Sequence, residues 1–497
     1  MDLLKKIKSK SLWRVLGILA FASALFLPMP AVMAWPARVV LGMTLWMAIY
    51  WISEAVPLAV ASLIPLVVLP VFSVMPMDMT ARFYADPNIF LFMGGFFLAL
   101  AMEKCALQKR IALHLIRVAG SGPRGLLGGF LLATGFISMW VSNTATTMMM
   151  LPIALAVIEQ LKRNPQGVPL DPRFATALML GIAYASNIGG IATLVGTPPN
   201  MIFAGQAKAL FPHFPEVSFV SWFLLCFPIA GGFLLITWVY LAWGVCGAMQ
   251  SQVFDRKIIE KEIAALGAWS GDEKKVMTIF GLTVFAWIFR GDIPLGHFTL
   301  PGWASLLGIQ GLHDGTVAIA AAILLFLIPS EKNQNDTLLN WAWAVKIPWG
   351  VLLLFGGGFA LAEGFQQSGL AAEVARVFTG LEGQPLFLTL LILCLVNTFG
   401  SELMSNSPQV TIMMPVLASA SASMHLHPYW LMIPATLMSS LAFMLPAGTP
   451  PNAIAFASGH VTMRQMVKTG FVLNVAASLW VSIMVWFLLP IFFDVKS

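Results

Sequence analysis

Apolar residues fill long stretches of the chain, and polar residues are concentrated between them. Stretches such as 223–245 and 472–491 are apolar on every side of a helix and show no alternation with a period of two. About 20 helical residues cross the hydrocarbon core of a bilayer. The pattern predicts apolar helices near 15–34, 39–53, 55–74, 88–103, 175–210, 219–246, 275–290, 316–330, 349–365, 429–459 and 468–493.

Two further apolar stretches, 125–160 and 384–424, are too long for one crossing and are interrupted by polar residues and proline. Non-helical backbone is tolerated at membrane depth only where it faces protein or a water-filled cavity. We therefore expect each stretch to be a re-entrant helical hairpin with its polar residues at the tip. The predicted fold class is an all-α polytopic membrane protein with about eleven transmembrane helices and two re-entrant hairpins.

The polar interruptions occur twice, in the same order. Residues 91–107 and 354–370 also agree at 8 of 17 positions. Inverted repeats of this kind in a membrane protein point to a substrate site at the interface of the two halves. The matched segments are Gly94-Gly95-Phe96 with Gly357-Gly358-Phe359, Ser142-Asn143-Thr144 with Ser405-Asn406-Ser407, Pro152 with Pro415, and Gly196-Thr197-Pro198-Pro199-Asn200 with Gly448-Thr449-Pro450-Pro451-Asn452.

Composition agrees with a membrane protein. The chain is 59% hydrophobic and 10% charged, whereas soluble domains average about 25% charged residues. A β-barrel would show alternating segments of about ten residues. The net charge of +6 follows topology and predicts no nucleic-acid partner. The four cysteines have no paired spacing, so we expect neither a disulfide nor a cysteine metal site.

The positions of lysine and arginine orient the chain. With the N-terminus inside, 22 of the 28 Lys and Arg residues fall in predicted cytoplasmic segments, as the positive-inside rule requires. We expect a cytoplasmic N-terminus and an outer C-terminus. The predicted cytoplasmic segments are 1–14, 104–124, 162–173, 250–275, 331–346 and 464–468, and the outer side keeps Arg38, Arg82, Lys208, Arg290, Arg376 and Lys496.

The basic start of the chain has two readings. Residues 1–14, followed by an apolar run, resemble a signal peptide, with Val32-Met33-Ala34 as a weak cleavage-like triplet. The rest of the chain spans the membrane repeatedly. We therefore favour a first transmembrane helix that its basic flank holds inside.

The repeats also predict the domain organisation. Residues 108–117 and 369–376 are short charged helices at matching places, and we expect them to be arms along the membrane surface. The predicted parts are N-terminal scaffold helices in 1–87, a first repeat in 88–249 with a hairpin at 125–160 and a broken helix at 196–200, a cytoplasmic linker in 250–275, scaffold helices in 276–348, and a second repeat in 349–497 with a hairpin at 384–424 and a broken helix at 448–452.

The motifs suggest an anion site beside cation sites. A break between two helices leaves N–H groups free at the start of one and C=O groups free at the end of the other. The first set suits an anion, and the second, with Ser and Asn oxygens and carbonyls such as those of Gly196 and Gly448, suits a small cation such as Na⁺. Neither motif pair contains Lys or Arg. Co-bound cations would then supply the positive charge, which couples anion binding to them.

Other interpretations stay open. A single Ser-Asn pair in an apolar helix is usually a helix–helix hydrogen bond, although here it recurs in both halves. Glu402, three residues before Ser405, is either a proton-coupling group or a carboxylate that satisfies groups at a helix junction. An intramembrane hydrolase would need a base beside Ser142 or Ser405, and no nearby His, Lys or Asp pairs with either serine in sequence. A channel would need a continuous pore. We expect no enzyme activity.

The motifs identify a resemblance from about Trp51 to the end. The chain resembles the divalent anion/sodium symporters. This resemblance implies homodimers with a scaffold domain and a transport domain, elevator-like movement, and di- or tricarboxylate or sulfate substrates. It implies an anion site formed by Asn143, Thr144, Thr197, Asn406, Ser407 and Thr449. It also implies two sodium sites, one at Ser138, Ser142, Asn143 and Gly196, and one at Ser401, Ser405, Asn406 and Gly448.

One segment departs from the family pattern. Ser407 is followed by Pro408, Gln409 and Val410 where a threonine-containing continuation is usual, which affects the expected substrate more than the mechanism. The predicted function is Na⁺-coupled uptake of a small divalent anion, above all a C4-dicarboxylate, across the inner membrane. A dicarboxylate exchanger and a sulfate or citrate carrier are the alternatives. Na⁺ is the co-transported ion, and no organic cofactor is expected.

Overall fold

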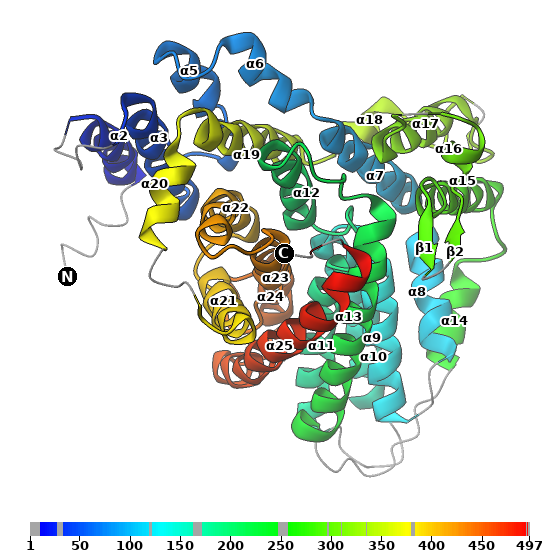
Figure 1. Ribbon diagram of the computed structural model, residues 1–497. Coiled ribbons are helices and arrows are strands. Elements are labelled where there is room, and N and C mark those ends of the chain that lie inside the picture. The colour runs from blue at the N-terminus through cyan, green and yellow to red at the C-terminus, as the bar shows by residue number, and fades with distance from the viewer. Residues whose placement is uncertain are drawn as a thin grey trace.

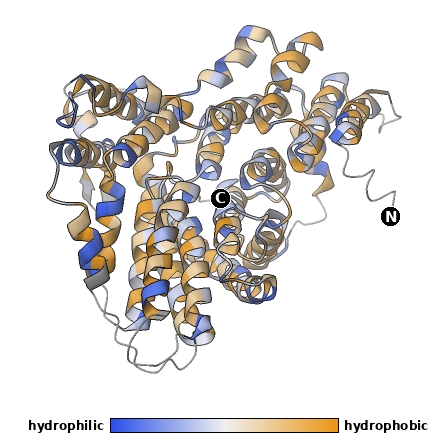
Figure 2. Cartoon of the chain, turned by 180° about the vertical axis from the view of Figure 1, so that it is seen from behind, coloured by the Kyte–Doolittle hydropathy of each residue, from blue (hydrophilic) through white to orange (hydrophobic). Residues whose placement is uncertain are grey.

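The computed structural model describes residues 10–26, 33–118, 122–162, 171–246, 257–295, 298–309, 311–333, 335–378, 383–493 and 495. Helices form most of the described chain (Figure 1), and apolar residues make up much of their length (Figure 2). The sheet in this part of the chain is a short antiparallel hairpin of β1 (Ile293–Leu295) and β2 (Phe298–Leu300). The all-α prediction is therefore confirmed at the level of a helical, apolar protein.

The N-terminal helices share a hydrophobic core of their own with α19 (Trp349–Gln367) and α20 (Leu370–Val377). The stretch predicted as one helix at 55–74 is two helices, because the chain turns at Ser62–Leu63 and Pro65 stands in the first turn of α5, where its missing N–H costs nothing. The predicted helix 15–34 is described to Phe26, and 27–32 lie outside the described residues. The elements are α2 (Lys10–Phe26), α3 (Trp35–Ser53), α4 (Leu58–Ala61), α5 (Ile64–Val71), α6 (Met77–Arg82) and the 3₁₀ turn η1 (Phe83–Ala85).

The order of helices in the first half recurs in the second. The first half comprises α7 (Pro87–Lys104), α8 (Leu107–Val118), α9 (Pro123–Ser138), α10 (Asn143–Lys162), α11 (Pro172–Gly190), α12 (Pro198–Leu210) and α13 (Phe219–Val239), which ends in the π-helical turn η2 (Tyr240–Val245). The second comprises α19 (Trp349–Gln367), α20 (Leu370–Val377), α21 (Leu386–Ser401), α22 (Asn406–Ser423), α23 (Tyr429–Ser439), α24 (Pro450–Ala457) and α25 (Met463–Phe492). Between them lie α14 (Lys257–Ala265), α15 (Gly271–Ile288), α16 (Trp303–Leu306), α17 (Asp314–Leu327) and α18 (Trp341–Ala344).

Each Ser-Asn motif lies where one helix ends and the next begins. The stretch predicted at 125–160 is α9 and α10, and the stretch predicted at 384–424 is α21 and α22. The stretches predicted at 175–210 and 429–459 are also helix pairs, interrupted at 191–197 and 440–449. These breaks begin before the predicted 196–200 and 448–452, because the paired prolines occupy the first turns of α12 and α24 instead of disrupting a helix from within.

Glycines permit close helix contacts at equivalent places in the two halves. A Cβ on Gly94 of α7 would lie 2.6 Å from the Cβ of Ala318 in α17, and a Cβ on Gly357 of α19 would lie 2.4 Å from the carbonyl oxygen of Ser62. Larger side chains do not fit at these crossings. The Gly-Gly segments of the repeat therefore fix α7 and α19 against helices that flank the two halves.

A buried ion pair fixes the amphipathic helix α8. Arg110 donates from Nε to Glu273 at 2.7 Å and from its other guanidine nitrogens to the carbonyl oxygens of Leu266 and Gly267. Burial acts to raise the pKa of Glu273, but the hydrogen bonds from Arg110 and Ser270 lower it below the usual value for glutamate. Helix α8 is thereby joined to the segment between α14 and α15, within the predicted linker.

Four of the described helices are long and apolar enough to cross a bilayer, judged by length and composition. Several predicted crossings are instead built from two shorter helices, such as α23 and α24. The number of about eleven crossings stays a prediction. The four helices are Met77–Lys104, Asn143–Leu161, Phe219–Val245 and Met463–Phe492.

Candidate functional site

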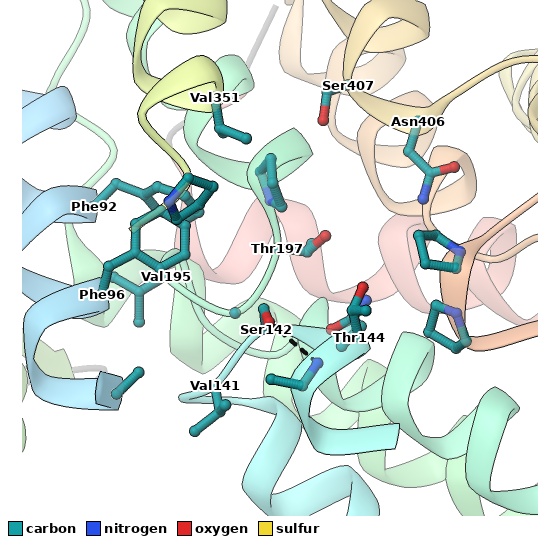
Figure 3. A pocket seen from close by; sticks show the side chains of 18 of the residues that line it. Phe92, Phe96, Val141, Ser142, Thr144, Val195, Thr197, Val351, Asn406 and Ser407 are labelled. Atoms are coloured by element: carbon teal, nitrogen blue, oxygen red, sulfur yellow. Dashed lines mark hydrogen bonds between the residues drawn. The ribbon is translucent and has the colours of Figure 1, made fainter. Parts of the chain in front are cut away.

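A cavity of about 510 Å³ lies where the four repeated motifs meet. One wall is formed by the two Ser-Asn segments and the two broken helices, and the other by α7 and the start of α19 (Figure 3). Its volume is in the range of small-molecule sites. All six residues predicted for the anion line it: Asn143, Thr144, Thr197, Asn406, Ser407 and Thr449.

Four helices begin at this cavity, so that their N-termini face it. Helices α10 and α22 begin at the two asparagines of the Ser-Asn motifs, and α12 and α24 begin at Pro198 and Pro450, all of which line it. The N-terminus of a helix carries a partial positive charge and free N–H groups. The arrangement supplies positive potential to an anion without a charged side chain in any motif.

The groups predicted for the cations lie at the same junctions. Ser138 and Ser401 end α9 and α21 and are fully buried behind the wall. Each donates from its hydroxyl to the Oδ1 atom of the asparagine five residues later, Asn143 or Asn406. The remaining predicted groups line the cavity: Ser142, Asn143, Gly196, Ser405, Asn406 and Gly448.

One asparagine bridges each break in the broken helices. Asn200 donates from Nδ2 to the carbonyl oxygens of Gly190 at 3.1 Å and Thr193 at 2.7 Å. Asn452 donates in the same way to the carbonyl oxygens ten and seven residues before it, at 3.0 and 3.1 Å. Both side chains are fully buried. The final residue of each Gly-Thr-Pro-Pro-Asn motif thus holds the two ends of the break together.

Asn187 of α11 connects the two halves across the cavity. Its Oδ1 atom accepts from Nδ2 of Asn143 at 3.4 Å, and its own Nδ2 donates to Oγ1 of Thr449 at 3.0 Å. The sequence prediction missed this residue. Ser186-Asn187 is another Ser-Asn pair within an apolar helix, and this pair could have identified Asn187 as a candidate site residue.

Glu402 satisfies polar groups at a helix junction, which is the structural one of its two interpretations. Its side chain is 3% exposed and accepts hydrogen bonds from the backbone N–H groups of Phe443, Met444 and Leu445 at 2.7 to 2.8 Å. Nδ2 of Asn474 donates to it at 2.9 Å. The carboxylate therefore satisfies the free N–H groups of the second break.

The unusual continuation of the second motif is explained by Gln409. Its Nε2 donates to the carbonyl oxygen of Asn397 at 2.9 Å and so joins α22 to α21. Pro408 stands in the first turn of α22, where a missing N–H costs little. The departure from the family pattern thus strengthens the junction of the two helices and leaves Ser407 on the cavity wall.

The opposite wall holds residues that the motifs did not predict. Phe92, Phe96 and Val351 face the polar groups (Figure 3), and Glu103 and Lys346 also line the cavity. Both charged residues are exposed, and Nζ of Lys346 lies 3.5 Å from the centre of the Trp343 ring. Their positions depend on how α7 and the segment before α19 pack against the other helices, which no local motif encodes.

No cluster of three or more His, Cys, Asp or Glu side chains with metal-binding geometry occurs among the described residues. The four cysteines are separate buried thiols. The residues predicted to bind cations in this cavity offer neutral oxygens of serine, asparagine and the backbone, which suit a hard, singly charged cation better than a transition metal.

Solved structures of membrane transporters share this fold. Neisseria gonorrhoeae MtrF, reported with a class of antimetabolite efflux pumps, aligns with a TM-score of 0.56 at 10% identity, over 96% of this chain and 94% of MtrF. The Alcanivorax borkumensis YdaH transporter aligns with a TM-score of 0.53 at 15% identity, over 83% and 87%. At these identities the likeness concerns the fold alone.

Proteins related by sequence share a larger fraction of identical residues with this chain. The sodium-dependent dicarboxylate transporter SdcS of Staphylococcus saprophyticus is 38% identical over 481 residues, which cover 96% of this chain and 91% of SdcS. SdcS of Staphylococcus aureus strain MRSA252 is 38% identical over 482 residues, with the same coverage. The family described as the sodium:sulfate symporter transmembrane region matches residues 8–493. The resemblance inferred from the motifs is confirmed, and the chain belongs to this sodium:sulfate symporter family.

Proposed function

We propose that the protein is a secondary active transporter that carries a small divalent anion, above all a C4-dicarboxylate, together with Na⁺. One observation carries the proposal: four helix N-termini and six neutral polar side chains converge on one cavity of about 510 Å³. The names of relatives at 38% identity support sodium and a dicarboxylate. A dianion fits positive helix ends, and hydroxyl and amide groups orient its carboxylates.

Sodium completes the charge balance of the site. In this proposal, one Na⁺ binds among Ser138, Ser142, Asn143 and the Gly196 carbonyl, and a second among Ser401, Ser405, Asn406 and the Gly448 carbonyl. The ends of α9 and α21 bring free carbonyl groups and the negative end of the helix dipole to these places. The anion binds tightly only while both cations are present, which couples its uptake to the Na⁺ gradient.

The architecture suits alternating access. In our proposal the pairs α9/α10 and α21/α22 are re-entrant hairpins that enter from opposite sides, and they move with the broken helices as a transport domain. The helices of 1–87 and 276–348 form a scaffold that pairs in a homodimer. The N-terminus is cytoplasmic and the C-terminus outside. Glu103 and Lys346 lie in or beside predicted cytoplasmic segments, so the cavity opens to the cytoplasm. A transporter of this design performs no chemistry on its substrate.

Transport by purified protein in liposomes tests the proposal. Empty proteoliposomes receive labelled succinate with and without an inward Na⁺ gradient, and uptake is expected only with the gradient. Asn143→Ala and Asn406→Ala remove one lining amide each and should both abolish uptake. Asn88→Ala, which removes a buried amide bonded to Asp86 outside the cavity, is the control. Equal uptake with and without Na⁺ would refute the symport.

Two alternatives have their own outcomes in the same assay. A dicarboxylate exchanger would take up succinate only when the liposomes contain an internal dicarboxylate, regardless of Na⁺. A sulfate or citrate carrier would show Na⁺-dependent uptake that excess unlabelled sulfate or citrate suppresses more strongly than unlabelled succinate. Chemical conversion of the substrate would point to an enzyme.

A further inference from the structure

We propose that a second cavity, at the predicted cytoplasmic ends of α2 and α3, binds the headgroup of phosphatidylethanolamine from the surrounding bilayer. This cavity has a volume of about 330 Å³ and lies between the start of α2 and the turn that joins α3 to α4. Its described lining residues differ from all those of the transport cavity. Three of them are charged: Lys10, Arg14 and Glu54.

The two basic side chains suit a phosphate group. Nε of Arg14 donates to the carbonyl oxygen of Ala55 at 2.9 Å, which ties the guanidinium to the α3–α4 turn. Among the described residues, the two terminal nitrogens of Arg14 and the ammonium group of Lys10 have no partner. A guanidinium fixed in this way can donate two parallel hydrogen bonds to a phosphate. Lys10 is four residues earlier, on the same side of α2, and adds a second positive charge.

Glu54 brings a carboxylate to the same cavity at a conformational cost. It caps the C-terminus of α3 in the left-handed region, with φ 48° and ψ 35°. Glycine is the usual residue at such a position, because a Cβ is unfavourable there. Within the part of the chain that the structure describes, the carboxylate forms no ion pair with Lys10 or Arg14. An unfavourable conformation that presents an unpaired charge to a cavity points to a binding role.

This set of charges selects among phospholipid headgroups. Two cations and one anion match a zwitterion, with the phosphate on Arg14 and Lys10 and the ammonium group on Glu54. An anionic headgroup would leave the carboxylate without a partner and repel it. The described residues that line the cavity include no aromatic ring, whereas sites for quaternary ammonium groups are built from aromatic rings. A primary ammonium group, which donates hydrogen bonds to a carboxylate, therefore fits better than choline.

The surface beside the cavity favours a lipid over a soluble phosphate compound. Ile18, one turn after Arg14 on α2, is 51% exposed, and Ile52, two residues before Glu54, is 55% exposed. Val15 and Leu19 extend this apolar surface along α2, at 53% and 56% exposure. In a bilayer these side chains contact acyl chains, so a phospholipid can place its headgroup in the cavity and its tails along the helices.

Native mass spectrometry of the full-length protein in detergent tests the proposal. Phosphatidylethanolamine, phosphatidylcholine and phosphatidylglycerol with identical acyl chains are titrated separately, and phosphatidylethanolamine should bind about five-fold more tightly than the other two. Glu54→Gln should abolish this preference. Glu54→Gly should abolish it as well, yet raise the melting temperature, because glycine suits the left-handed conformation. Glu260→Gln, which removes an exposed carboxylate of α14, is the control and should keep the preference.

The unaltered protein provides a second measurement that needs no variant. Free phosphoethanolamine at millimolar concentration should not displace the bound lipid, since it lacks the acyl chains. Displacement would overturn the assignment to a lipid. Equal binding of phosphatidylethanolamine and phosphatidylcholine, or tighter binding of phosphatidylglycerol, would overturn the assignment to this headgroup. Retention of the preference by both Glu54 variants would do the same.

Discussion

The hydroxyl of Ser138 lies 2.8 Å from Oδ1 of Asn143, across the gap between α9 and α10. Ser138→Ala removes the donor that orients this amide and one predicted Na⁺ ligand. We expect the Na⁺ concentration for half-maximal succinate uptake to rise about ten-fold, since a lost hydrogen bond to a neutral group is worth about 1 kcal/mol and a lost ligand adds to it. Ser419→Ala, another buried serine with a backbone hydrogen bond, should leave uptake unchanged. Equal responses of both variants would contradict the assignment.

The bridging amides Asn200 and Asn452 should be needed for the shape of the breaks. Alanine at either position leaves two buried carbonyl groups without their donor, which costs about 1–3 kcal/mol for each group. We expect the melting temperature of each variant to fall and succinate uptake to be lost. Asn200→Asp is the sharper test, because it keeps the size of the side chain but loses both N–H donors. Normal uptake by this variant would show that the bridge is dispensable.

Lys346 and Glu103 should act on the dianion in opposite directions. Removal of the positive charge in Lys346→Gln should weaken succinate binding at saturating Na⁺, and removal of the negative charge in Glu103→Gln should strengthen it, each by about three- to ten-fold at low ionic strength. Lys346→Arg should restore binding. Titration calorimetry at 50 mM and 500 mM salt checks this, since salt screens both effects. Changes in the same direction would indicate a structural cause.

Gly189 should tolerate no side chain. A Cβ at this position of α11 would lie 2.1 Å from the carbonyl oxygen of Gly135 in α9. Gly189→Ala should lower stability by about 1–3 kcal/mol through overpacking and reduce transport with it. Gly231→Ala in α13 is the control, because no described atom outside its chain neighbours and its own helix backbone lies within 4 Å of its Cβ position. Melting curves of the two variants in detergent give the comparison, and equal curves would refute the close contact.

The ion pair between Lys104 and Asp336 should stabilise the protein in a pH-dependent way. Nζ of Lys104 lies 2.8 Å from Oδ2 of Asp336, and this hydrogen bond lowers the pKa of Asp336 below its usual value. A lowered pKa gives stability that is present above the unfolded value of about 3.9 and is lost as the pH falls through the folded value. Asp336→Asn should therefore cost about 1 kcal/mol at pH 7 and progressively less below pH 4.

The matched control for this pair is Asp171→Asn. Its partner Arg173 is two residues away, and more than half of the arginine side chain is exposed. The pair therefore joins no distant segments, and its loss should change the melting temperature little. A constant difference between Asp336→Asn and the unaltered protein from pH 7 to pH 3 would contradict the linkage.

The sequence predicted those parts of the site that local chemistry encodes. The Ser-Asn pairs and the Gly-Thr-Pro-Pro-Asn segments recur, so their convergence on one place followed from the repeat alone, and every predicted anion residue lines the cavity. Lys346 was missed because its position depends on how α18 and α19 meet α7, many residues away in sequence. The extent of each helix break was also misjudged, because proline ends a helix or begins one depending on the chain before it.

The side-chain amides of Asn200 and Asn452 each donate to the carbonyl oxygens ten and seven residues before them. The two chain segments that these amides enclose nevertheless have little sequence in common. Residues 191–195 read Ile-Ala-Thr-Leu-Val, and their counterparts 443–447 read Phe-Met-Leu-Pro-Ala. The amide therefore closes the same frame around two loops of different composition. Exchange of these loops between family members is a route to altered ion or cargo preference that leaves the frame of the fold untouched.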